Sequence, residues 1–276
     1  MKSRVSILFV AVLMCICKSS WALAPTKEYK STPAKLKMKY EEQRIQTPDG
    51  ASLLAWYFPS PRITNKMILV SHNGVGNMGE NLARIKSLIS FGFNVLCYDY
   101  RGFGQSSEFG IDDDTYIYTE FYDDFKTVYD FAVENYNRRL YLYGWGIGAT
   151  IGNTVGFDLP NTNTIISDGS INKFSDMPDR FKKIGSRMHI DQDVISNYKD
   201  PYTIFANTPG ANLRAILLMM GSHDYLLSKE DMSMLSERSQ SVYIQVYTMD
   251  NKRSWDNYRH NPSLYMKVIH QFLVNN

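Results

Sequence analysis

Five residues, Gly144-Trp145-Gly146-Ile147-Gly148, follow a short apolar run at 140–143 and precede a segment, 149–157, that we expect to be helical. A buried strand, a turn bracketed by glycines and a helix are the elements of a G-x-S-x-G nucleophile elbow, which presents its central residue at the top of a parallel sheet. The central residue here is Gly146, which has no side chain that could attack a carbonyl carbon. The pattern therefore predicts the backbone turn that carries a nucleophile in such elbows, with a residue that cannot act as one.

The same turn also satisfies a second pattern. Gly144, Gly146 and Ala149 match the dinucleotide fingerprint G-x-G-x-x-G/A, and Asp168 follows at about the spacing of a ribose-binding acid, roughly 20 residues. A dinucleotide fold carries this fingerprint after its first strand, whereas here roughly a hundred residues of alternating strands and helices come before it. The elbow is therefore favoured, and dinucleotide binding at 144–149 is kept as an alternative.

The elements that must position this turn follow from the apolar pattern. From Lys66 onward short apolar runs alternate with segments of helical spacing, which is typical of a mostly parallel sheet with helices on both faces. Before it, 43–47 and 52–58 flank the turn residues at 48–50 and predict a hairpin. We expect an α/β fold with an eight-stranded sheet, in which the irregular stretch 172–207 is a possible cap over the site.

The N-terminus has the features of an export signal. Residues 1–22 combine basic residues, an apolar centre at 5–16 and small residues before a cleavage point after Ala22. The apolar centre is too short for a comfortable membrane span, and no later run reaches about 18 apolar residues. We expect a secreted or periplasmic protein without a stable membrane span, consisting of a polar, solvated leader at 23–42 and one domain at 43–276.

Charge and cysteine content exclude several classes of protein. Removal of the signal eliminates three positive charges and no negative ones, which changes the formal net charge from +2 to −1 and excludes a strongly basic nucleic-acid-binding protein. Of the three cysteines only Cys97 would remain, so no intrachain disulfide can form. The acidic runs at 112–114 and 123–124 lack the spacing of a metal site, and we expect neither a metal nor a cofactor.

Three further motifs occur in the order found in the α/β-hydrolase superfamily. They are Ser71 to Asn77, which resembles the H-G-N-A-G-N loop of that family, Asp99 to Ser106, which resembles its D-x-R-G-x-G-x-S loop, and Gly221 to Asp224, which resembles its G-x-x-D motif. The chain is thus similar to the serine aminopeptidase-like, esterase and thioesterase branch of the superfamily, from about Gln43 to the C-terminus.

The resemblance implies a Ser-His-acid site in which a serine attacks, a histidine takes its proton and backbone amides hold the oxyanion. It assigns the nucleophile position to Gly146, the acid to Asp224 and the oxyanion amides to Gly74 and Ile147. The nucleophile is therefore lost from an otherwise recognisable site.

The base is also in doubt. In the family the histidine comes from the loop after the last strand, here 249–261, and the place where we expect it, 251–253, reads Asn-Lys-Arg. His260, at the far end of the loop, is the remaining candidate base.

These residues predict a non-catalytic pseudo-hydrolase that binds a small molecule, an acyl ligand or a protein partner in the former catalytic cleft. The first alternative is an active esterase, thioesterase or peptidase in which Asp224 and His260 activate water directly. The second is dinucleotide binding at 144–149.

Overall fold

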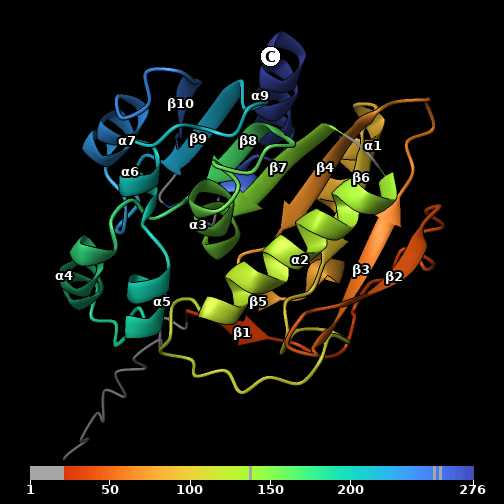
Figure 1. Ribbon diagram of the computed structural model, residues 1–276, viewed down its shortest axis with the longest axis horizontal. Coiled ribbons are helices and arrows are strands. Elements are labelled where there is room, and N and C mark those ends of the chain that lie inside the picture. The colour runs from red at the N-terminus through yellow and green to blue at the C-terminus, as the bar shows by residue number, and fades with distance from the viewer. Residues whose placement is uncertain (1–21, 137–138, 251–252, 255–256) are drawn as a thin grey trace, which may run out of the picture.

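The computed structural model describes residues 22–136, 139–250, 253–254 and 257–276. The expected signal peptide lies outside these residues except for Ala22. Figure 1 shows a twisted central sheet with helices on both of its faces. None of the helices in the described part of the chain has the length and apolarity needed to cross a bilayer.

The central sheet has eight strands in the order β10-β9-β8-β7-β4-β6-β3-β2. They are β2 (Glu41–Gln46), β3 (Ser52–Phe58), β4 (Lys66–Ser71), β6 (Asn94–Tyr98), β7 (Arg139–Trp145), β8 (Thr162–Asp168), β9 (Ala215–Gly221) and β10 (Tyr243–Met249). β2 and β3 form the expected antiparallel hairpin, β3 pairs antiparallel with β6, and the pairs from β6 to β10 are parallel. The predicted fold class is confirmed.

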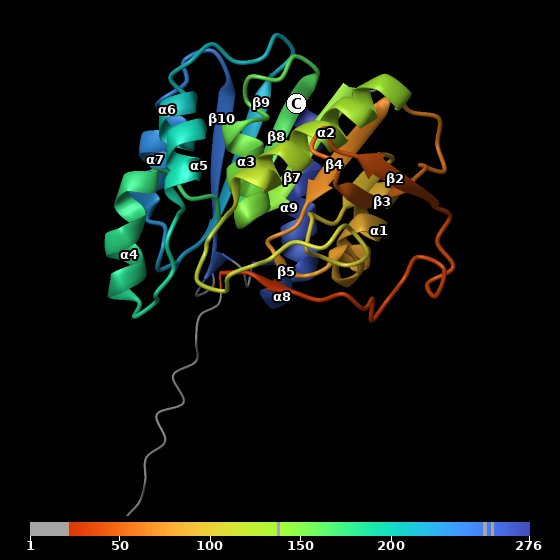
Figure 2. The same cartoon turned by 60° about the horizontal axis from the view of Figure 1, so that its bottom comes forward.

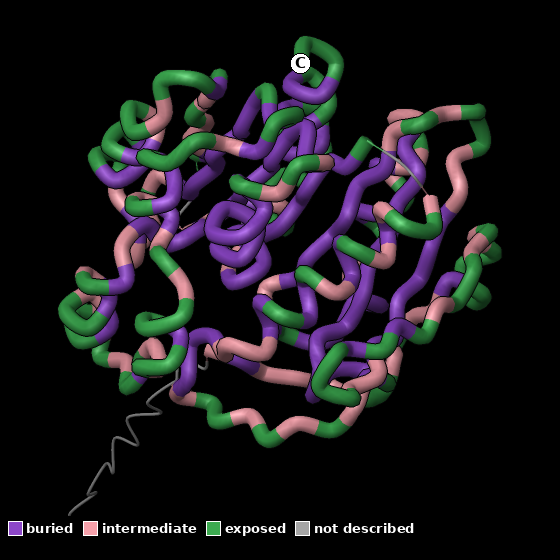
Figure 3. Tube along the Cα trace, viewed as in Figure 1, coloured by how far each residue is buried: buried purple, intermediate pink, exposed green. Residues whose placement is uncertain are grey.

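The two faces of the sheet bury separate hydrophobic cores. In β4, Met67 and Leu69 belong to one core while Ile68 and Val70 belong to the other, because successive side chains of a strand point to opposite faces. The central strands are consequently buried, except for the first residues of β4 and β7 (Figure 3).

The helices divide between these two cores. α2 (Thr119–Tyr136), α3 (Ile147–Thr154) and α7 (Lys229–Ser236) contribute to the first core, and α1 (Leu82–Ser90) and α9 (Pro262–Asn275) to the second. Three short helices follow β8 within the expected cap region, namely α4 (Met177–Lys183), α5 (Gln192–Asn197) and α6 (Pro201–Ile204). The remaining short elements are α8 (Asn257–His260) and the 3-10 helices Met78–Asn81 and Phe174–Asp176.

Cys97 lies in the middle of the sheet. In β6 it pairs with Val70 of β4 on one side and with Trp56 of β3 on the other, and it is only 1% exposed. Burial raises the pKa of its thiol well above the usual value. A buried thiol of this kind is inert, since the thiolate is the reactive form.

The leader at 23–42 packs against the domain, although most of its residues are half-buried or exposed. Leu23 is fully buried, and β1 (Ala24–Pro25) pairs in parallel with β5 (Val75–Gly76). Figure 2 shows the leader running along the bottom of the domain beside β5. The folded unit therefore begins well before residue 43.

Side chains hold the leader in place. The Tyr29 hydroxyl donates to the carboxylate of the fully buried Asp99, and Asn77 Nδ2 donates to the carbonyl oxygens of Thr26 and Glu28, at 3.2 and 2.9 Å. These contacts join residues that are distant in the sequence, so composition alone does not predict them.

Candidate active site

Gly146 keeps the backbone of an elbow. It has φ +56° and ψ −123° and stands immediately before α3. Its N–H donates to the carbonyl of Asp168 at 2.9 Å, and its carbonyl accepts from Thr150 N at 3.1 Å. A Cβ at this position would lie 3.0 Å from Cβ of Asn73, so Asn73 occupies the space beside the missing side chain.

The flanking glycines permit the turn to pack against its neighbours. A Cβ on Gly148 would stand 2.2 Å from the carbonyl oxygen of Ser71, and one on Gly144 would stand 2.3 Å from the backbone of Gly148. Both distances are well inside van der Waals contact. The G-x-G-x-G pattern therefore reflects close approach of β7, α3 and the loop after β4.

A cavity of about 370 Å³ opens beside Gly146. Its walls come from the loop after β4, the 3-10 helix and α1, the ends of β7 and β8, the loop after β9 and the segment around α8. The cap region contributes Met188. All five histidines of the chain lie among the described residues, and none of them lines this cavity.

Asp224, the expected acid, lines the cavity in the loop that follows β9. Its Oδ1 accepts from the backbone N–H groups of Leu226 and Leu227 at 2.8 and 3.0 Å, and its Oδ2 accepts from the N–H of Ser254 at 2.7 Å. The carboxylate thus organises two loops through backbone donors.

Ser254 lies beside the acid, in the loop after β10 from which the resemblance expects the histidine. It lines the cavity, and its Oγ accepts from Gly221 N at 3.1 Å. Gly169 lies between Ser254 and Gly146. A Cβ on Gly169 would be 2.8 Å from Cβ of Ser254 and 4.0 Å from the backbone nitrogen of Gly146, so Ser254 and Gly146 lie near each other. Ser254 was missed because this loop has no periodic pattern that fixes its register, and residues 251 and 252 of the expected position lie outside the described part.

His260 is not brought to the cavity. It is exposed at the last position of α8, whereas its neighbours Tyr258 and Arg259 line the cavity wall. The structure therefore does not place the remaining candidate base beside Asp224.

The two expected oxyanion amides, those of Gly74 and Ile147, differ in whether they already donate a hydrogen bond. The N–H of Gly74 donates to Nδ1 of His72 at 3.1 Å. Because Nδ1 accepts this bond, it carries no proton in this arrangement. Ile147 is the first residue of α3, where backbone N–H groups have no partner within the helix. Only the second amide is free to face the cavity.

A buried polar chain forms the wall behind Gly146. The carboxylate of Asp168 accepts from Asn257 Nδ2 at 2.6 Å and from the hydroxyl of Tyr265 at 2.9 Å. The Tyr143 hydroxyl lies 2.9 Å from that of Tyr265 and accepts from Nη1 of Arg84 at 2.9 Å. Burial raises the pKa of Asp168 to about 7, against the lowering influence of Arg84 and of its two hydrogen-bond donors.

Two observations weigh against the dinucleotide alternative. The parallel strands run β6-β4-β7-β8, so the glycine turn follows the third parallel strand in chain order, and the sheet lacks the 3-2-1-4-5-6 order of the dinucleotide fold. Asp168 is 2% exposed and already bonded to Asn257 and Tyr265.

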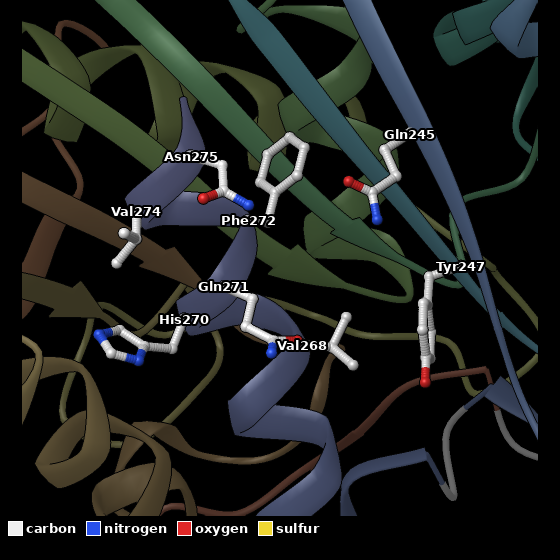
Figure 4. A pocket seen from close by; sticks show the side chains of 8 residues that line it. All are labelled: Gln245, Tyr247, Val268, His270, Gln271, Phe272, Val274 and Asn275. Atoms are coloured by element: carbon white, nitrogen blue, oxygen red, sulfur yellow. The ribbon is translucent and has the colours of Figure 1, made fainter.

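A separate depression of about 530 Å³ lies between β10 and α9. In Figure 4 Gln245 and Tyr247 extend from β10 toward α9, where Val268 and Phe272 form the facing wall. It contains no residue of the elbow or of the loops around it, and we do not assign it to the site.

The fold and the turn define an α/β-hydrolase fold, and comparisons with known proteins agree. The family model described as serine aminopeptidase, S33, matches residues 63–190, less than half of the chain. The α/β-hydrolase domain-containing protein WAV2 of Arabidopsis thaliana is 34% identical over 83 residues, which are 29% of this chain and 27% of that protein. The uncharacterized protein YfhR of Salmonella typhimurium is 25% identical over 244 residues, covering 79% of this chain and 76% of that protein.

Among solved structures, an esterase of Pyrococcus furiosus has a TM-score of 0.72 at 17% identity and covers 92% of this chain and 97% of its own. A carboxyl esterase of Bacillus coagulans has a TM-score of 0.63 at 14% identity, with 86% and 99% covered. Identities this low show the fold alone. The chain therefore has the α/β-hydrolase fold, and its residues 63–190 match the serine aminopeptidase, S33, family model.

Replacing Gly146 by alanine should destabilise the protein by about 1–3 kcal/mol, because a side chain would be held in a left-handed conformation and pressed against Asn73. The measurement is urea unfolding followed by circular dichroism. Gly152→Ala in the same helix is the control, since nothing lies within 4 Å of a Cβ there, and it should stabilise by about 0.4–1 kcal/mol. Equal stability of the two variants would contradict the strained turn.

The raised pKa of Asp168 should make stability depend on pH. The pKa rises from 3.8 to about 7 on folding, so in this window the folded protein binds a proton that the unfolded chain has lost. The contribution of Asp168 to the free energy of unfolding is therefore largest below pH 3.8, the unfolded pKa. It falls as the pH rises to the folded pKa of about 7, by at most about 1.4 kcal/mol per pH unit. Unfolding in urea from pH 4 to 8 should show this slope, and Asp168→Asn should remove it.

The exposed Asp130 provides the control, because Asp130→Asn changes the same charge at the surface of α2 and should preserve the slope. An unchanged slope in Asp168→Asn would show that another group binds the proton.

Proposed function

We propose that this protein is a secreted or periplasmic member of the superfamily that binds a small, partly apolar ligand in the cavity beside Gly146 and does not hydrolyse esters by the serine route. One observation carries the proposal. The elbow and the acid are retained, while the nucleophile position is a glycine and no histidine lines the cavity.

Other features of the site support the proposal. Asn73 stands where the H-G-N-A-G-N loop has a small glycine, and it fills the space beside Gly146. The Gly74 amide is already bonded to His72, so the oxyanion site has one free backbone donor instead of two. Removing a single oxyanion donor slows acyl transfer by roughly 10²–10³-fold. The proposed loss thus affects the nucleophile, the base and one oxyanion donor, and leaves the acid in place.

The retention of Asp224 does not argue for catalysis. Its carboxylate accepts three backbone N–H groups, including that of Ser254, and these bonds hold the loop after β9 against the loop after β10. An aspartate in this role would be kept for its structural contribution alone.

Wild-type protein should therefore show no labelling by a fluorophosphonate probe and no turnover of nitrophenyl butyrate. Labelling should appear when the missing groups are restored together, in the variant Asn73→Gly, Gly146→Ser, Ser254→His. The same variant without the histidine should stay unlabelled, because loss of the base alone slows a serine protease by roughly 10⁶-fold. Mass spectrometry of the labelled peptide checks the site of modification.

Serine-directed labelling of the wild-type protein, together with turnover, would overturn the proposal. Turnover without labelling that is lost in Asp224→Ala or His260→Ala would instead support an active hydrolase of a non-standard type.

The proposed export rests on the signal-like composition of residues 1–22. Cleavage after Ala22 would leave in place Leu23 and the strand Ala24–Pro25, which are part of the fold. Expressed in full in a bacterial host, the protein should be recovered outside the cytoplasm with Leu23 as its first residue, as read by N-terminal sequencing. Full-length protein retained in the cytoplasm would contradict export.

A further inference from the structure

Arg84 is a buried cation in the wall of the cavity. It projects from α1, is 6% exposed and lines the cavity beside Gly146. Its guanidinium lies 4.1 Å from the ring centroid of Trp145 and 4.2 Å from that of Tyr258. Stacking on aromatic faces holds the planar group in one orientation and partly compensates for lost hydration.

The guanidinium has few polar partners of its own. A guanidinium has five N–H donors. In the described part of the chain Arg84 uses Nη1 to donate to the Tyr143 hydroxyl. Within the described ranges, no carboxylate oxygen lies inside the 4.0 Å of an ion pair with Arg84. The Asp168 carboxylate attracts the guanidinium without contacting it, across the two tyrosine hydroxyls. A buried cation that no carboxylate contacts directly is incompletely compensated, so the arrangement favours an anion in the adjacent cavity.

The acids that line the cavity are already engaged elsewhere. Glu80 lies 3.2 Å from the ammonium group of Lys30, and Asp224 accepts from backbone N–H groups. Asp168 is bonded to Asn257 and Tyr265. None of these three carboxylates is paired with Arg84, which leaves its remaining donors to a ligand.

The cavity also has apolar lining. Arg84 stands among Trp145, Tyr143 and Tyr265, which belong to the second core, whereas Ile171, Met188 and Leu227 belong to the first core. The cavity is lined from both groups. Its lining therefore combines a buried cation with apolar side chains.

We propose that the cavity binds a monocarboxylate with an apolar chain, whose carboxylate pairs with the guanidinium of Arg84 and whose chain lies against Ile171, Met188 and Leu227. This inference rests on the proposed function, because it names the ligand class of the same cavity. A volume of about 370 Å³ suits a small ligand of this kind.

The geometry favours a carboxylate over a phosphate group. One planar guanidinium matches a carboxylate through two parallel N–H···O bonds. A doubly charged phosphate would gather several donors, but the only other cation lining the cavity from the described residues is the exposed Arg259. The three acids in the same walls would repel a second negative charge.

The test measures binding of sodium octanoate and of octan-1-ol, which has the same chain without the charge, by isothermal titration calorimetry. The wild-type protein should bind octanoate at least tenfold more tightly than octanol. Arg84→Met should weaken octanoate by about 30-fold or more, as expected when one partner of a buried charge pair is removed, and should change octanol by less than about threefold.

Matched variants separate ligand binding from folding. Arg62→Met makes the same substitution at an exposed site outside the cavity and should bind both compounds as the wild-type protein does. If Arg84→Met does not fold, Arg84→Lys keeps the charge, lacks the planar fork and should weaken octanoate by about tenfold.

Equal affinity for the two compounds, absence of octanoate binding, or retention of octanoate by the folded Arg84 variants would each overturn the carboxylate assignment. None of these results bears on fluorophosphonate labelling, so the proposed loss of serine chemistry succeeds or fails separately. Hydrolysis of nitrophenyl octanoate combined with Arg84-dependent octanoate binding would refute the former and retain the latter.

Discussion

The left-handed backbone at residue 146 is the constraint on which the site depends. To enter α3 directly from β7, the chain must turn within one residue, and the turn is fixed by the bonds of Gly146 to Asp168 and Thr150. An α/β-hydrolase ordinarily holds a nucleophile in this strained conformation, because strain there exposes the reactive oxygen. With glycine the conformation carries little strain. The turn at Gly146 therefore has the backbone of an elbow with little of the strain that a residue with a side chain would have there.

Two polar residues lie close to the turn and to the acid. A Cβ at position 146 would stand 3.0 Å from Cβ of Asn73, and the N–H of Ser254 donates to Asp224. The oxygens of Asp224 accept from backbone donors of two loops, a role that does not depend on proton transfer. Asp224 therefore has a structural role whatever chemistry the cavity supports.

The sequence predicts the sheet well because its central strands are buried on both faces and appear as uninterrupted apolar runs, as at 67–70, 140–143 and 215–220. Glycine spacing likewise locates the elbow, since close packing at 144 and 148 excludes any side chain. Ser254 and the aromatic stack around Arg84 could not be predicted, because they join segments far apart in the chain without a local pattern. The contacts of the leader with β5 and Asp99 could not be predicted for the same reason.

The position of Cys97 has a practical consequence. It is the one cysteine of the described residues, and it sits between neighbouring strands near the middle of the sheet. Its thiol lies in the second core, 3.8 Å from Sδ of Met78, so a thiol reagent can reach it only when the cover over that face of the sheet opens, and the rate of its modification reports this opening under native conditions. The molecule thus carries an internal probe of its own cooperative unfolding, without any engineered label.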